Sequence, residues 1–205
     1  MMNVDDGDPD ATETWPGSYP PADITATEFE GWVSEILAAA GERVGNLRVT
    51  LHEKVVGLDG EYDFDATARF GWAGIEFLVL VEAKCHKDPI KRELVQVLYQ
   101  KLQSVGAHKA VMVSTAPYQS GALTFAKAHG VALVQVTEGR FTILLKSAGE
   151  HAVLTRQEAS ERYQTPTFVG YCYGPGDSRE SIRSTITSSD HPDYVVEMLL
   201  DPPWA

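Results

Sequence analysis

The sequence has little cysteine and no long apolar run. Its two cysteines, Cys85 and Cys172, are far apart in a chain of 205 residues, so they form neither a metal-binding pair nor a disulfide framework. The longest apolar run, Phe77–Val81, is much shorter than the roughly 20 residues that a membrane span needs. The chain opens with MMNVDDGDPD, which is acidic and polar, unlike a signal peptide. We therefore expect a protein of the reducing cytoplasm with no membrane partner.

Several catalytic motifs are also missing. The sequence contains no glycine-rich phosphate loop of the Walker type, no C-x-x-C pair and no G-x-S-x-G elbow. These absences give no support to ATP hydrolysis, zinc binding or esterase activity. With 43% hydrophobic and 22% charged residues, the composition is that of a globular protein and excludes wholesale disorder.

Basic residues are scarce, and the net charge of -12 is unevenly distributed. Residues 1–23 carry -6, residues 24–146 carry -1 and residues 147–205 carry -5. Within the near-neutral middle, however, residues 84–101 carry +3. This basic strip is either a solvated helix face or a surface for DNA phosphates. Its basic residues are Lys84, Lys87, Lys91, Arg92 and Lys101.

The chain divides by composition into three parts. Residues 1–23 are rich in Asp, Pro, Gly and Thr and are expected to form an acidic, disordered arm. Residues 24–146 alternate between helical and strand patterns, which predicts one α/β domain with a mixed sheet flanked by helices. Residues 147–205 form a C-terminal appendage of unknown role. The domain is expected to contain helices at 26–40, from Asp88-Pro89 to about 104, and at 119–129, and strands at 47–56, 61–70, 75–84, 109–115, 131–136 and 141–145.

A hairpin is predicted where the strand at 61–70 is followed by the strand at 75–84. Apolar and polar residues alternate in the first strand, so its two faces are expected to differ. A four-residue loop at 71–74 would place Phe70 opposite Ile75. One face would carry Tyr62, Phe64, Ala66 and Ala68, and the other Glu61, Asp63, Asp65 and Thr67.

This register would gather charged groups at one end of the hairpin. Asp63 would lie opposite Glu82, and Glu61 opposite Lys84, with Cβ atoms about 5 Å apart. A divalent cation such as Mg²⁺ would offset the repulsion between the two carboxylates. Two carboxylates, a metal ion and a lysine are groups that can catalyse phosphodiester hydrolysis. The alternative is an exposed sheet edge with cross-strand ion pairs. Asp65 is either a second acid or a residue that flanks the sheet.

The order of motifs between residues 26 and 136 resembles a nuclease family. Glu61–Phe64 resembles its acid-bearing second strand, and Val81–Lys84 resembles its E-x-K strand. Val111–Thr115 and Gly130–Leu133 resemble its later strands. On these motifs the chain resembles the PD-(D/E)xK nuclease superfamily, in its Mrr-like, type IV restriction endonuclease branch. The resemblance implies a restriction-endonuclease-like core.

The resemblance also implies metal-dependent cleavage of DNA, with Mg²⁺ as the cofactor and Mn²⁺ as a substitute. Asp63 and Glu82 would ligate the metal, and Lys84 would position the attacking water. Glu30 matches an acid that some members place near the metal. Its alternative role is that of a capping-box partner for Thr27 at the start of the first helix.

Further residues are expected to contact the DNA or support the site. The basic strip would contact DNA phosphates through residues that flank the motif, so binding should weaken as salt rises. The helix after the motif carries a glutamine and a tyrosine, as related nucleases do, here spaced Q-x-x-Y. The phosphate contacts are Lys87, Lys91, Arg92 and Lys101, and the accessory pair is Gln96 and Tyr99.

The leading hypothesis is a Mg²⁺-dependent endodeoxyribonuclease in restriction, defence or repair. The main alternative is a catalytically silent nuclease-fold module that binds DNA or a protein partner. A third reading is a structural domain of a defence or repair complex. Symmetric cutting of duplex DNA would suggest a homodimer, and a partner subunit of a defence system is the other partner considered.

Overall fold

The computed structural model describes residues 22–43, 46–72, 74–139, 154–175, 182–193 and 195–196. Almost all of the expected acidic arm and the strand expected at 141–145 lie outside these ranges. In the part of the chain that is described, no helix is long and apolar enough to cross a membrane.

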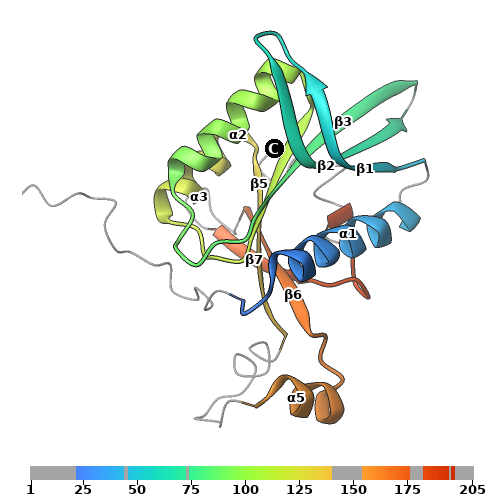
Figure 1. Ribbon diagram of the computed structural model, residues 1–205, viewed down its shortest axis with the longest axis vertical. Helices are drawn as coiled ribbons and strands as arrows, with labels where there is room; N and C mark the ends of the chain where they lie inside the picture. Colours follow the sequence, from blue (N-terminus) through green and yellow to red (C-terminus); the bar gives the residue numbers. More distant parts are fainter. Residues whose placement is uncertain are drawn as a thin grey trace, which may run out of the picture.

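A seven-stranded sheet forms the centre of the molecule (Figure 1). Its strands are β1 (Arg48–Val56), β2 (Glu61–Trp72), β3 (Ile75–Lys84), β4 (Lys109–Ser114), β5 (Ala132–Glu138), β6 (Phe168–Pro175) and β7 (Ile182–Thr187). They lie side by side in chain order. The pairs β3–β4 and β4–β5 are parallel, and the other neighbouring pairs are antiparallel. This arrangement confirms the predicted α/β class with a mixed sheet.

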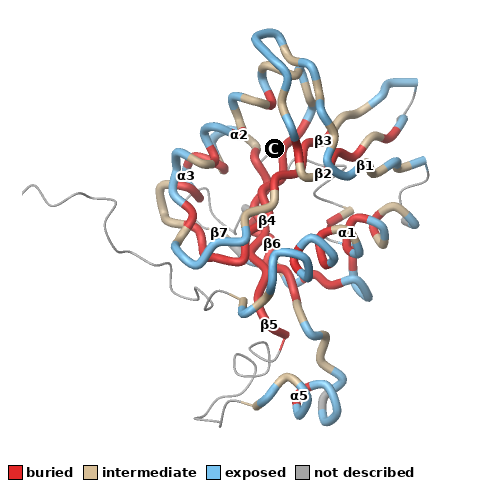
Figure 2. Tube along the Cα trace, viewed as in Figure 1, coloured by how far each residue is buried: buried red, intermediate tan, exposed pale blue. Residues whose placement is uncertain are grey.

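Helices cover both faces of the sheet. α1 (Ala26–Arg43) packs on one face, and α2 (Arg92–Val105) and α3 (Ser120–His129) pack on the other (Figure 1). A further short helix, α5 (Arg156–Tyr163), precedes β6. Because both faces are covered, every residue of β4 and β5 is buried, as the central strands of Figure 2 show.

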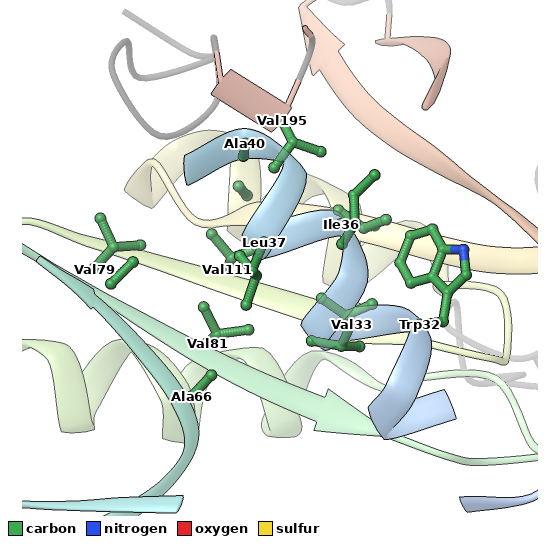
Figure 3. Packing of buried hydrophobic residues seen from close by; sticks show 14 of the residues in the cluster. Trp32, Val33, Ile36, Leu37, Ala40, Ala66, Val79, Val81, Val111 and Val195 are labelled. Atoms are coloured by element: carbon green, nitrogen blue, oxygen red, sulfur yellow. The ribbon is translucent and has the colours of Figure 1, made fainter. Parts of the chain in front are cut away.

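The core on the α1 face follows from helical spacing. Trp32, Val33, Ile36 and Leu37 recur at intervals that place them on one side of α1, and all four are buried against the sheet (Figure 3). The sheet contributes small and β-branched residues to the same cluster, among them Ala66, Ala68, Val79, Val81, Val111 and Val134.

Thr25 caps α1, so the capping box expected at Thr27 and Glu30 is wrong by two residues. The backbone N–H of Glu28 donates to Oγ1 of Thr25 at 3.3 Å, and the backbone N–H of Thr25 donates to Oε2 of Glu28 at 2.9 Å. The structure therefore gives Glu30 no part in the capping box of α1.

α2 begins at Arg92, later than the expected start at Asp88-Pro89. The reason is an isolated bridge between Ile90 and Tyr118. The backbone N–H of Ile90 donates to the carbonyl of Pro117 at 2.8 Å, and the carbonyl of Ile90 accepts from Gln119 at 3.0 Å. These two bonds hold the chain extended until residue 91.

Two strands of the region expected to be an appendage extend the central sheet. β6 pairs with β5 from Leu133 to Glu138, and β7 pairs with β6. Cys172 of β6 joins the core under α1, and Tyr173 joins the core under α2 and α3. At Gly170 the backbone approaches α1 so closely that an added Cβ would lie 2.9 Å from Cη2 of Trp32.

The substitution Gly170→Ala tests whether β6 belongs to this core. Its methyl group would also lie 2.9 Å from Cγ1 of Val134, so we expect a loss of about 1–3 kcal/mol in the free energy of unfolding by overpacking. Gly60→Ala is the control, because nothing lies within 4 Å of the Cβ that it would add. Urea unfolding that shows equal, small changes for both variants would contradict this packing.

Candidate active site

The β2–β3 hairpin pairs in a register two residues away from the expected one. Trp72 lies opposite Ile75, and Phe70 lies opposite Phe77 rather than Ile75. The connection between β2 and β3 is shorter than the predicted loop at 71–74, so β2 continues to Trp72. Gly74 in this connection has a φ of +81°, a conformation that favours glycine. The expected pairing of Asp63 with Glu82, and that of Glu61 with Lys84, are therefore wrong.

The pairing of β1 with β2 is interrupted at one position. Leu51 pairs with Ala66 and Glu53 pairs with Phe64, but His52 and Asp65 between them do not pair. His52 has a φ of +49°, which is uncommon for a residue other than glycine. We call this interruption, at His52 and Asp65, the β1–β2 break.

β2 changes faces at the β1–β2 break. In an unbroken strand, residues 62 to 70 at every second position would share one face. Instead, Ala66 and Ala68 lie in the core under α1, whereas Tyr62 and Phe64 pack in the core under α2 and α3. The predicted single apolar face is wrong for this reason. The outer half of the β1–β2 hairpin leans towards α2, where Ser104 accepts a 2.9 Å hydrogen bond from the N–H of Leu58 (Figure 1).

Asp63 is exposed beside β1. It alternates with Phe64, which faces α2, so Asp63 projects from the opposite face of β2. Its side chain is 73% exposed, and its recorded ion-pair partner is Lys54 of β1, at 4.0 Å. The structure does not bring Asp63 to Glu82.

Glu82 does lie beside Lys84, and a second lysine joins them. Nζ of Lys84 is 2.6 Å from Oε1 of Glu82. Nζ of Lys101, on α2, is 3.2 Å from Oε2 and 3.4 Å from Oε1. The Glu82 side chain is only 12% exposed, so these charges interact with little screening by solvent. One carboxylate is thus held between two ammonium groups on the α2 face of β3.

Asp65 is the acid that contacts β3. Its Oδ2 accepts a 2.6 Å hydrogen bond from the backbone N–H of Ala83, the residue between Glu82 and Lys84. The backbone pairing of β2 with β3 ends at Ala66 and Val81. The N–H of Ala83 lies beyond this last pair, and the Asp65 carboxylate accepts its hydrogen bond in place of a backbone carbonyl. Asp65 also lines an open pocket between α1 and the strands, together with Glu30, His52 and Ala83.

The remaining predicted residues lie around this region without joining it. Lys87, Lys91 and Arg92 are exposed where β3 leads into α2, and Gln96 is exposed on α2. Tyr99 is half-buried instead and packs against the rings of α3. Its ring centroid lies 5.9 Å from that of Phe125 and 4.6 Å from that of His129.

Two features of the site were missed or underrated from the sequence. Lys101 was expected on the DNA surface, but it contacts Glu82. Asp65 was given two possible roles, a second acid or a residue that flanks the sheet, and it is the β2 acid that bonds to β3. The spacing of 19 residues between Glu82 and Lys101 was available from the sequence, but it becomes informative only with the placement of α2 on the sheet. Apolar and polar residues alternate without interruption through Asp65, so the sequence pattern does not show that the strand changes faces there.

The carboxylates here are of the chemical type that a hard divalent cation prefers, but they lie on two sides of β3. Glu82 and Asp65 offer carboxylate oxygens, and Mg²⁺ commonly binds through one or two carboxylates and several waters. Among the described residues, no group of three or more His, Cys, Asp or Glu side chains is arranged to hold a metal ion. Both oxygens of Glu82 already face ammonium groups. A cation at Glu82 therefore requires that at least one of these contacts be released.

Comparison with protein families decides what kind of domain carries this site. A family model described as a restriction endonuclease, Mrr_cat, matches residues 22–138, which is more than half of the chain. The chain belongs to this Mrr restriction endonuclease family. The matched region runs from the residues before α1 to the end of β5, so the Mrr domain includes Glu30, Asp65, Glu82 and Lys101. The resemblance seen in the sequence is confirmed.

Two solved structures are similar to the Mrr-family chain over about half of its length. A protein of unknown function, AF1548, is 18% identical with a TM-score of 0.42, and the match covers 52% of this chain and 55% of that chain. The DNA modification-dependent restriction endonuclease AspBHI is 20% identical with a TM-score of 0.28, and the match covers 48% of this chain and 26% of that chain. The match therefore spans about half of AF1548 and about a quarter of AspBHI. No curated protein matches the chain.

An ion pair beside the β1–β2 break stabilises the local geometry. Arg69 donates to Oε2 of Glu53 at 2.5 Å, and the hydroxyl of Thr67 donates to the same oxygen. The hydrogen bond from Arg69 lowers the pKa of the Glu53 carboxyl below its ordinary value, and the bond from Thr67 adds to this effect while burial opposes it. The ion pair joins the first β1 residue beyond the break to β2.

The substitution Glu53→Gln tests this ion pair through pH. A depressed pKa means that Glu53 stabilises the fold above its ordinary pKa of about 4.5 and loses that contribution as pH falls through the lower, folded value. We expect the variant to lose about 1 kcal/mol in the free energy of unfolding at pH 7, and a smaller amount below pH 4.5.

Urea unfolding at both pH values measures the difference. Glu61→Gln is the matched control, because Glu61 is 54% exposed and its ion pair with Lys54, at 3.3 Å, should contribute little. A difference between Glu53→Gln and the parent that grows as pH falls would contradict the sign of this linkage.

Proposed function

We propose that this protein is a metal-dependent endodeoxyribonuclease that hydrolyses phosphodiester bonds of DNA in restriction, defence or repair. The observation that carries the proposal is the buried Glu82 at the end of β3, with Lys84 two residues later, inside a region that belongs to the Mrr restriction endonuclease family. An acid with 12% exposure beside two lysines is unusual for a residue that serves only solubility.

We assign the second acid to Asp65 in place of Asp63. Asp65 is bonded to the backbone of Ala83, the residue next to Glu82, whereas Asp63 is exposed beside Lys54. Glu82 and Asp65 would hold the metal ion once the Glu82 carboxylate leaves its lysines on the α2 side and turns past the end of the β2–β3 ladder, because Asp65 and the supporting Glu30 line the pocket on the α1 side. When bound, Mg²⁺ would polarise a phosphoryl oxygen and lower the pKa of a bound water. Lys84 would orient the attacking water.

DNA would approach along the exposed part of the basic strip. Lys87, Lys91 and Arg92 are exposed next to the end of β3, which suits contacts to phosphates on either side of the cut. Such contacts release counterions, so binding should weaken steeply as salt rises. A homodimer would allow symmetric cutting of both strands.

The two aspartates of β2 give a matched test of this assignment. We expect Asp65→Asn to lower Mg²⁺-dependent cleavage of duplex DNA at least about 100-fold, because it removes a metal-binding oxygen. Asp63→Asn makes the same chemical change two residues away and should keep cleavage within about twofold of the parent. Glu82→Gln should abolish cleavage.

Cleavage of plasmid DNA with Mg²⁺ or Mn²⁺ measures all three variants, with circular dichroism as the check on folding. Loss of cleavage with Asp63→Asn but not with Asp65→Asn would restore Asp63 as the catalytic acid. If the single variants Asp65→Asn and Glu82→Gln both cleave DNA as fully as the parent does, the proposed nuclease site is overturned.

A second candidate function is a silent nuclease-fold module that binds DNA without cutting it. The contact of both Glu82 oxygens with lysines favours this candidate, because those oxygens are the ones that a metal would need. DNA binding by the parent that persists without any metal-dependent cutting would support it.

A further inference from the structure

We propose that Lys101 is a positioning residue that competes with the divalent cation for Glu82. This inference rests on the proposed metal site and adds a residue from α2 to it. In the absence of metal, Lys101 would hold the carboxylate on the α2 face of β3. Metal binding would require the ammonium of Lys101 to leave.

The contacts of Lys101 differ from those of a DNA-binding lysine. Its side chain is 20% exposed, and its ammonium faces both oxygens of Glu82. The same ammonium lies 5.4 Å from the centroid of the Phe64 ring, which is itself 2% exposed. The carboxylate of Glu82 and the ring of Phe64 together form a site that suits one cation.

The placement of Phe64 in this site is a consequence of the β1–β2 break. Because β2 changes faces at Asp65, Phe64 turns towards α2 and covers Lys101. The tip of the β1–β2 hairpin also contacts α2 at Ser104, which is less than one turn beyond Lys101. A Cβ added to Gly57 would lie 3.1 Å from backbone atoms of Ser104. The hairpin therefore packs on α2 at two places, with Phe64 beside Lys101 and Gly57 beside Ser104.

Charge explains why a metal and Lys101 exclude each other. Glu82 carries one negative charge and already has two ammonium partners, so these three groups sum to +1. A divalent cation at the same carboxylate would add two positive charges within a few ångströms of both lysines. Like charges at that separation disfavour one another strongly in a site with little solvent. Lys84 lies closer to Glu82, at 2.6 Å against 3.2 Å for Lys101, and in the proposed mechanism it orients the attacking water, so Lys101 is the lysine that gives way.

DNA would assist this exchange. A phosphate next to Glu82 offers the displaced ammonium of Lys101 a new negative partner, so metal and DNA should bind with positive coupling. The metal-free protein would then bind cations weakly until substrate arrives. Lys101 would act as a safeguard against metal binding without DNA.

The test measures the dissociation constant for Mn²⁺ by isothermal titration calorimetry with the full chain in the absence of DNA. We expect Lys101→Met, which removes the charge and keeps an unbranched apolar stem, to bind Mn²⁺ about tenfold more tightly than the parent. Lys91→Met is the matched control, because Lys91 is exposed and its loss changes the net charge equally. It should alter affinity by less than about twofold. Lys101→Arg keeps the charge and should bind no more tightly than the parent.

The outcomes separate this inference from the proposed function. If Glu82→Gln binds Mn²⁺ as the parent does, there is no metal site at Glu82, and the proposed function fails together with this inference. If binding depends on Glu82 but Lys101→Met binds equally or more weakly, Lys101 supports the site instead of competing for it, and this inference alone is overturned. Should Lys101→Met not fold, Lys101→Gln takes its place in the same comparison, with the same expected gain and the same contradicting result.

Discussion

The separation of β2 from β3 at Asp65 is the constraint on which the rest of the structure depends. Up to Ala66 and Val81 the two strands form a regular ladder, and beyond that point the Asp65 carboxylate bonds to the backbone of Ala83. At the same position β1 adopts a positive φ at His52. Backbone groups that leave a ladder need other partners, and the side chain of Asp65 supplies one. The hairpin is thereby free to lean towards α2.

This separation places the charged groups in two sets. Asp65 and Glu30 line the pocket on the α1 side, whereas Glu82 and its two lysines lie on the α2 side. Ala83, between Glu82 and Lys84, touches both sets. In the proposed function these acids share one cation, and the lysine contacts of Glu82 form an arrangement that this cation would have to change.

Local patterns predicted most of the elements but not their relations. Helical spacing from Phe29 to Leu37 predicted α1, and alternation predicted β2. Both predictions were possible because a buried face requires apolar residues at the period of the helix or the strand. The register of the β2–β3 hairpin was wrong by two residues because loop length sets register and the sequence allowed more than one length. The face change at Asp65 accompanies contacts between Gly57 and Ser104, 47 residues apart in the chain, and alternation does not encode such contacts. Glu82 and Lys84 were found together because they are two residues apart on one strand, whereas Lys101 was assigned to the DNA surface and Asp65 was left open between a second acid and a flanking residue.

Nuclear Overhauser contacts of the Phe64 ring test the central claim most directly. The account predicts contacts from this ring to the methylene protons of Lys101 on α2, while the methyl group of Ala66, two residues along the same strand, contacts side chains of α1 such as Val33. Contacts from both Phe64 and Ala66 to α1 would mean that β2 keeps one face throughout. That result would remove the β1–β2 break and, with it, the enclosure of Lys101 beside Glu82.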